Sequence, residues 1–157
     1  MTEKVTNIVI AGLGGQGVIR ASDILAYAAF LSGYDVKKSE IHGMSQRGGS
    51  VHSDIRFGSN VLSPMIPAGT ADFLVMLSED QVETNMRCLG EHGKLISCNR
   101  IRIESLPNKR CQNVAMMGIL SMELPIDQDL WIEAIRMQLP KNLHAINEQA
   151  FALGTNS

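Results

Sequence analysis

Two glycine-rich segments of the chain combine residue types and spacings that suit chemistry. The first is GLGGQG, with the pattern G-x-G-x-x-G, and its residues of interest are Gly12, Gly14, Gly15, Gln16 and Gly17. It follows an apolar run and precedes a helix-compatible stretch. Glycines in that position let backbone N–H groups approach a phosphate at a helix N-terminus. The segment therefore predicts a ligand-binding or phosphate-binding turn, with tight packing of strand, turn and helix as the alternative.

Whether the glycine turn can be interpreted as a dinucleotide site depends on an acidic residue further along the chain. A dinucleotide site also needs a carboxylate about 20 residues further on, at the end of the second strand, to hold the ribose. Glu40 stands in about that place. It also leads directly into the next glycine-rich segment, so it could serve that loop instead. Both interpretations remain open at the level of the residues.

The second segment is HGMSQRGGS, which is a poor helix and a poor strand. Its glycine pair gives the backbone freedom at a cost of about 1 kcal/mol per glycine relative to alanine. A solvated connection with Arg47 in water is one interpretation. The other is a loop that presents the Arg47 guanidinium to another chain or to an anionic ligand. The predicted interface loop comprises Glu40, His42, Gly43, Met44, Ser45, Gln46, Gly48 and Gly49, with Arg47 as the candidate active-site or interface contact.

Composition and spacing argue against several other classes of protein. The net charge is −2, so no global positive field exists to hold nucleic acid or an anionic membrane. The three cysteines and four histidines show no metal-ligand spacing, so no metal site is expected. We expect a cytoplasmic chain, because no signal peptide or membrane-spanning run is evident. The basic residues of the segment 100–110 lack interleaved aromatic residues and predict a solvated edge.

The pattern of apolar runs predicts an alternation of strands and helices. Strands are expected at 7–12, 34–40, 50–58, 72–77 and 94–98, and helices at 18–32, 78–88, 114–122, 127–138 and 142–152. Turn residues after Gly58 predict a hairpin between the strand 50–58 and Val61–Leu62. Gly90 and Gly93 are expected to end the helix that Ser78 begins. Trp131 and Ile135 are expected in the core.

These elements indicate an α/β fold that forms one domain over residues 1–157. We expect a three-layer sandwich built on a Rossmann-like, mostly parallel sheet, with an antiparallel hairpin as the excursion. Buried parallel strands read as continuous apolar runs, which is the pattern of the first and fourth expected strands.

Three ordered motifs carry a resemblance to a known family. NIVIAGLGGQGV, EIHGMSQRGGSVHSDIRFG and SPMIPAGTADFLV together resemble the gamma-type small subunit of 2-oxoacid:ferredoxin oxidoreductases. GMSQRGGSV is most similar to the beta subunit of indolepyruvate ferredoxin oxidoreductase. The likeness continues through NVAMMGILS and NEQAF and so covers nearly the whole chain. The polar segment NRIRIESLPNKR departs from the family pattern.

The resemblance implies a function that composition could not show. Such enzymes decarboxylate a 2-oxoacid, here indolepyruvate or a related aryl pyruvate, oxidatively to an acyl-coenzyme A and reduce ferredoxin. It implies thiamine diphosphate, Mg and iron–sulfur clusters in a large partner subunit, and no cofactor bound by this chain alone. Coenzyme A is the co-substrate. The small subunit would help to shape the active site and could receive coenzyme A.

Two other classes of function stay open beside this one. The first is a stand-alone Rossmann-type nucleotide-binding oxidoreductase that uses the glycine turn with Glu40. The second is a non-catalytic module whose only role is assembly of a complex. Binding of NAD or FAD by the chain alone would favour the first, and full activity after glycine-turn and Arg47 substitutions would favour the second.

Overall fold

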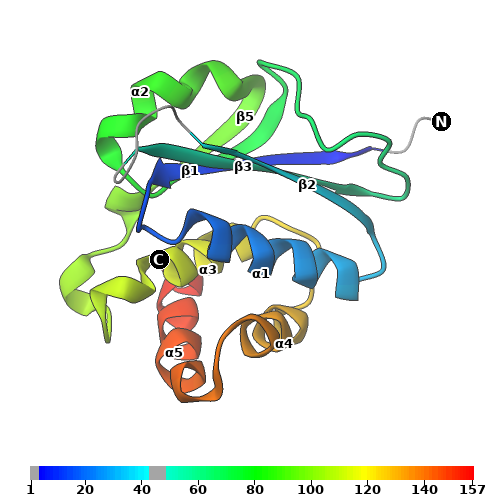
Figure 1. The fold of residues 1–157 in the computed structure, drawn as a ribbon. Coiled ribbons are helices and arrows are strands. Elements are labelled where there is room, and N and C mark those ends of the chain that lie inside the picture. The colour runs from blue at the N-terminus through cyan, green and yellow to red at the C-terminus, as the bar shows by residue number, and fades with distance from the viewer. Residues whose placement is uncertain (1–3, 43–48) are drawn as a thin grey trace.

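The computed structural model describes residues 4–42 and 49–157 and shows a mixed sheet with helices on both faces (Figure 1). The strands are β1 (Thr6–Leu13), β2 (Asp35–His42), β3 (Ser50–Gly58), β4 (Ala71–Met76) and β5 (Leu89–Ser97). The α-helices are α1 (Val18–Leu31), α2 (Val82–Asn85), α3 (Gln112–Ser121), α4 (Gln128–Gln138) and α5 (His144–Thr155). The expected α/β class is confirmed.

The strands lie in the order β2-β3-β1-β4-β5. β1, β4 and β5 are parallel, whereas β3 is antiparallel to both of its neighbours, β1 and β2. The central strands β1 and β4 carry the apolar runs that the sequence marked as buried, since both of their faces are covered. The antiparallel excursion is therefore the β2–β3 hairpin, which spans the second glycine-rich segment.

The alternation of side chains along β1 divides the core between the two faces of the sheet. Ile8 and Ile10 face the layer formed by α1, α3, α4 and α5, and both are fully buried. Val9 and Ala11 face the other side, where they pack with α2 and neighbouring residues such as Ile66. This second layer is thin, and hydrogen bonds hold it to the sheet. Asp54 accepts the Ile66 N–H at 3.4 Å.

The hairpin predicted at Gly58 is wrong. β3 pairs instead with β2, with Asp35 opposite Gly58, and Val61–Leu62 belongs to no strand. The carboxylate of Asp35 accepts the Val61 N–H at 2.8 Å, so Val61 turns inward as an isolated buried side chain. This N–H contact and the neighbouring Lys37 lower the pKa of Asp35 below its usual value.

The glycines expected to end the helix at 78–88 lie inside a strand. Gly90 and Gly93 belong to β5, and the pairing of β5 with β4 shifts register between Ala71 and Phe73. A Cβ on Gly93 would stand 2.5 Å from the Ala71 carbonyl oxygen, so the irregularity needs a residue without a side chain. The predicted helix itself is three short consecutive pieces, 79–81, 82–85 and 86–88.

The C-terminal helices confirm the sequence prediction, and α3 is the most buried of them. Every residue of α3 from Asn113 to Ser121 is buried. α3 crosses α5 where Gly118 and Gly154 face each other, and each glycine lies directly against backbone of the other helix. Trp131 and Ile135 on α4 are fully buried, as expected. Within the described residues, no helix combines the length and apolarity needed to span a bilayer.

Candidate functional site

The glycine turn connects the end of β1 to the start of α1. Gly15 and Gly17 have left-handed φ angles of +88° and +81°, which favour glycine. The side-chain Oε1 of Gln16 accepts the Leu13 N–H at 2.7 Å and so holds the turn from within. The Gly17 carbonyl accepts the Ala21 N–H at 3.0 Å and begins the helical ladder. The turn is thus fixed by its own residues before any ligand arrives.

Close packing also requires glycine at two of these positions. Only one of them shows the predicted packing of strand against helix. A Cβ on Gly12 would lie 3.1 Å from the Leu77 Cβ and 3.2 Å from a Val18 methyl, which is the expected approach of strand and helix. Gly17 packs against α3 instead, since a Cβ there would lie 2.9 Å from the Asn113 Cγ and closer still to its Nδ2. The Asn113 amide donates to the Gly17 carbonyl at 3.1 Å. Gly17 thereby joins α1 to α3.

We expect Gly17→Ala to lower the free energy of unfolding by about 2–3 kcal/mol. About 1–2 kcal/mol comes from the left-handed backbone, and displacement of the Asn113 side chain adds to it. Gly15→Ala is the matched control, because Gly15 has a similar φ and nothing lies within 4 Å of its Cβ position. Urea unfolding of both variants measures the difference, and equal losses would contradict the role of Asn113.

The end of the second glycine-rich segment meets the glycine turn. The Gly14 N–H donates to the Gly49 carbonyl at 2.8 Å. The antiparallel pairing of β1 with β3 brings the two together, since Leu13 lies opposite Ser50. The predicted loop residues Gly43, Met44, Ser45, Gln46, Arg47 and Gly48, and the side chain of His42, lie outside the described residues. The end of the second segment, at Gly49 and Ser50, therefore meets the glycine turn at the carboxyl end of β1.

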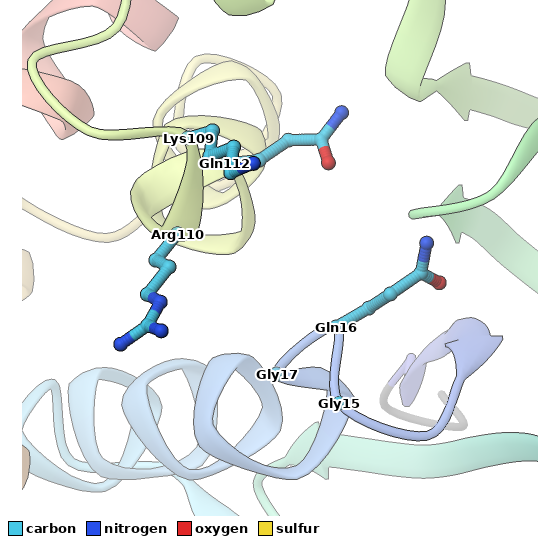
Figure 2. Close-up of a pocket in the computed structure, with 6 residues that line it drawn as sticks. All are labelled: Gly15, Gln16, Gly17, Lys109, Arg110 and Gln112. Atoms are coloured by element: carbon cyan, nitrogen blue, oxygen red, sulfur yellow. The ribbon is translucent and has the colours of Figure 1, made fainter. Parts of the chain in front are cut away.

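A cavity of about 500 Å³ opens at the turn (Figure 2). Gly15, Gln16 and Gly17 form one wall, and the start of α3 contributes the other wall with Lys109, Arg110 and Gln112. The Gln16 and Gln112 side chains extend toward the same space, while Arg110 is directed over α1. Of the described residues that line the cavity, none is acidic and two are cationic, so this lining is positively charged. Glycine backbone at a helix N-terminus beside cationic side chains suits an anion.

The position in the fold also favours a binding site here. After β1 the chain passes to α1 on one face of the sheet, and after β4 it passes to α2 on the opposite face (Figure 1). β1 and β4 are adjacent and parallel. In open α/β sheets, ligands bind in the crevice outside the carboxyl ends of the strands, at such a switch of direction. The glycine turn occupies this point.

Glu40 lies away from the glycine turn, on the edge strand β2. Its carboxylate accepts from the Lys38 ammonium at 2.6 Å, and that ammonium also donates to Asp23 of α1. Burial lowers the pKa of Lys38, but the two carboxylates more than offset it, so the pKa is raised. β3 separates β2 from β1. A dinucleotide site needs its acidic residue on the strand beside the glycine turn, so this strand order does not fit one.

Sequence reasoning missed the second wall of the cavity. Lys109 and Arg110 were expected on a solvated edge, and both are exposed, but they also line the cavity. Asn108 turns the chain here, because its Oδ1 accepts the Arg110 N–H at 2.9 Å. Their position beside the glycine turn is a long-range effect, since it depends on how α3 packs against α1. No local pattern of charges carries it.

The described residues contain no group of three or more His, Cys, Asp or Glu side chains placed to hold a metal ion. Cys88, Cys98 and Cys111 stand on separate elements, and burial raises the pKa of each thiol. The donor set does not fit an iron–sulfur cluster, which needs several thiolates around one centre.

The fold is that of known oxidoreductase subunits. The gamma subunit of a keto/oxoacid ferredoxin oxidoreductase from Geobacter sulfurreducens superposes with a TM-score of 0.81 at 19% identity, covering 98% of this chain and 95% of that one. A 2-oxoglutarate:ferredoxin oxidoreductase from Magnetococcus marinus, whose structure has 2-oxoglutarate, coenzyme A and succinyl-CoA bound, gives a TM-score of 0.80 at 19% identity. It covers 99% of this chain and 31% of that longer chain.

Sequence comparison identifies the family. Residues 7–107 match the family model described as pyruvate ferredoxin/flavodoxin oxidoreductase. The indolepyruvate oxidoreductase subunit IorB of Thermococcus kodakarensis is 32% identical over 197 residues, covering 98% of this chain and 96% of the relative. The chain belongs to the pyruvate ferredoxin/flavodoxin oxidoreductase family, which confirms the resemblance that the three motifs carry.

Proposed function

We propose that the chain is the small subunit of a complex that oxidatively decarboxylates indolepyruvate or a related aryl pyruvate to an acyl-coenzyme A, with reduction of ferredoxin. The family membership and the similarity to IorB support this substrate class. Thiamine diphosphate, Mg and iron–sulfur clusters would belong to a large partner subunit. The Magnetococcus structure supports such a partner. The match covers only 31% of that longer chain, so in that protein the matching part is joined to a larger remainder.

The role proposed for this chain is to hold the anionic part of coenzyme A. One observation carries it: the glycine turn, the Gly49 end of the loop and two cationic side chains meet at the carboxyl end of β1. Coenzyme A would supply the thiol that accepts the acyl group. Backbone N–H groups of Gly15 and Gly17 would meet its phosphates, and Lys109 would neutralise part of their charge. Arg47 would approach the same ligand or the partner from the loop.

The test begins with anaerobic purification of the chain from its native host. We expect a large subunit that carries thiamine diphosphate and iron–sulfur clusters to accompany it. The purified complex should reduce ferredoxin with indolepyruvate only when coenzyme A is present. The absence of such a partner would contradict the complex, and micromolar binding of NAD or FAD by the chain alone would favour a stand-alone oxidoreductase.

Lys109→Gln should raise the KM for coenzyme A about tenfold at an unchanged kcat. A charge-assisted contact to phosphate contributes about 1.5 kcal/mol or more, and it is made equally in the ground and transition states. Lys141→Gln is the control, because Lys141 is exposed before α5 and does not line the cavity. The measurement is ferredoxin reduction against coenzyme A concentration. Unchanged kinetics in Lys109→Gln would exclude this residue from the coenzyme A site.

A further inference from the structure

The strand β2 forms one edge of the sheet, and half of its backbone hydrogen-bonding groups face outward. Among the described residues, β3 is the one strand that pairs with it. In an antiparallel strand every second residue directs its N–H and C=O groups away from a given neighbour. No backbone hydrogen bond from another described segment reaches these outward groups. Such an edge can pair with a strand of another chain.

The two edges of the sheet differ in regularity. β5 forms the other edge, and its pairing with β4 shifts register between Ala71 and Phe73. Irregularities of this kind protect an edge from further pairing. β2 pairs with β3 without a register shift over all eight of its residues. β2 is therefore the edge that is better suited to accept another strand.

Charged side chains often protect an edge strand, but those of β2 are already neutralised. Lys37 forms an ion pair with Asp35 at 2.9 Å. Lys38 forms ion pairs with Glu40 at 2.6 Å and with Asp23 of α1. β2 itself carries two lysines and two acidic residues, so its net charge is zero when its histidine is neutral. The electrostatic barrier that edge lysines usually provide is therefore weak here.

The direction of the side chains limits how two copies of β2 can pair. A two-fold axis normal to the sheet makes the two strands antiparallel and keeps each face continuous, so one residue lies opposite itself. Within the eight residues of β2, the longest overlaps are centred on Lys38 or on Ser39. Lys38 at the centre would bring two ammonium groups together. Ser39 at the centre places Lys38 of each copy opposite Glu40 of the other, so β2 is complementary to itself in this register.

Apolar side chains beside the edge add surface that a further strand would cover. On the α1 face of β2, Val36 lines an open groove of about 420 Å³ together with Tyr27 and Phe30 of α1. The Phe30 side chain is 63% exposed. On the other face, Ile41 is 41% exposed and would lie opposite the aliphatic part of Lys37 from the second copy. Apolar contact is therefore available on both faces of β2.

We propose that β2 pairs with β2 of a second copy of this chain, antiparallel and centred on Ser39, so that the two sheets become one. The open edge, its neutral charge and its self-complementary register support this pairing, which does not depend on the proposed function. The α1 helices of both copies would lie on the same face of the joined sheet, because the axis is normal to it. Any complex that contains the chain would then contain it in pairs.

Disulfide trapping in the full chain tests the register. Opposed Cα atoms in an antiparallel pair stand about 4.5–5.5 Å apart, which is within disulfide range. Ser39→Cys should therefore form a disulfide between two copies on oxidation in air, and mass spectrometry distinguishes it from disulfides of Cys88 or Cys98. Lys37→Cys is the matched control, because Lys37 would lie opposite Ile41 and not opposite itself. No disulfide at residue 39 in a folded chain, or equal trapping of Lys37→Cys, would overturn the proposal.

Analytical ultracentrifugation tests the association itself. The unchanged chain should form a dimer at micromolar concentrations. Glu40→Lys should raise the dissociation constant about tenfold, because it replaces two attractive contacts by two repulsive ones. Glu83→Lys makes the same change of charge at an exposed position of α2 and should leave the constant unchanged. Thermal melting verifies that each variant is folded.

Three results would contradict a pair of identical chains. The first is a monomer at micromolar concentrations, and the second is an unchanged dissociation constant in folded Glu40→Lys. The third is trapping of Ser39→Cys by a strand of the large subunit in the purified complex, which would assign the β2 edge to that subunit.

Discussion

Replacing Gly154 by alanine is expected to lower the free energy of unfolding by about 3 kcal/mol or more. A Cβ at this position would stand 2.9 Å from the carbonyl carbon of Ala115 and closer still to its oxygen. Overpacking of a core typically costs about 1–3 kcal/mol, and here the obstacle is backbone, which no rotamer change can move aside. For a chain of this size the loss corresponds to a fall in Tm of about 6–12 °C.

The reciprocal variant and a control sharpen this test. Gly118→Ala should behave like Gly154→Ala, because its Cβ would meet the Phe151 carbonyl across the same helix crossing. Ala152→Leu adds a larger side chain to an exposed position of α5 and should leave the Tm nearly unchanged. Thermal unfolding followed by circular dichroism measures all three. A Tm for Gly154→Ala within about 2 °C of the unchanged chain would contradict close contact of the α3 and α5 backbones.

This helix crossing also explains which parts of the site the sequence could predict. The glycine turn follows from local chemistry, since a buried strand, a glycine pattern and a helix are consecutive in the chain. Lys109 and Arg110 become its neighbours only because α3 packs between α1 and α5, with Gly17 against Asn113 and Gly154 against Gly118. Neither glycine contact is visible in a local pattern, so the sequence predicts only a solvated edge for the basic residues.

The errors in the fold have similar causes. Val61 and Leu62 follow turn residues, as a second hairpin strand would, but Val61 is held by Asp35, which is 26 residues away. The local pattern around Gly90 and Gly93 predicts the end of a helix. Glycine is needed there for a different reason, since the backbone of the neighbouring strand lies against both positions in β5. Burial of Trp131 was predictable, since its periodicity with Ile135 on α4 is local. Local sequence patterns therefore predict where the helices and strands lie. Contacts between these elements determine which of them pair or pack together.

Arg47→Ala should lower activity of the assembled complex by about tenfold or more while leaving the Tm of the chain unchanged. If the loop presents this guanidinium to a carboxylate or a phosphate, its loss removes a charge-assisted contact of about 1.5–3 kcal/mol. A loop arginine contributes little to the core, and surface changes usually stay within about 0.5 kcal/mol. Gly49 at the end of this loop bonds to the glycine turn, which supports a role at the same site.

Arg47→Lys separates charge from geometry, because an ammonium keeps the charge and loses the planar fork, so it should restore activity only in part. Arg136→Ala is the matched control, since this arginine forms an exposed ion pair with Glu148 on the far helices and should leave activity unchanged. Ferredoxin reduction at varied coenzyme A assigns the contact. A raised KM for coenzyme A alone would place Arg47 at that ligand, whereas weaker association with normal kinetics would place it at the partner subunit. Unchanged association, kinetics and melting in Arg47→Ala would show that this arginine is solvated and that the loop serves only to connect β2 with β3.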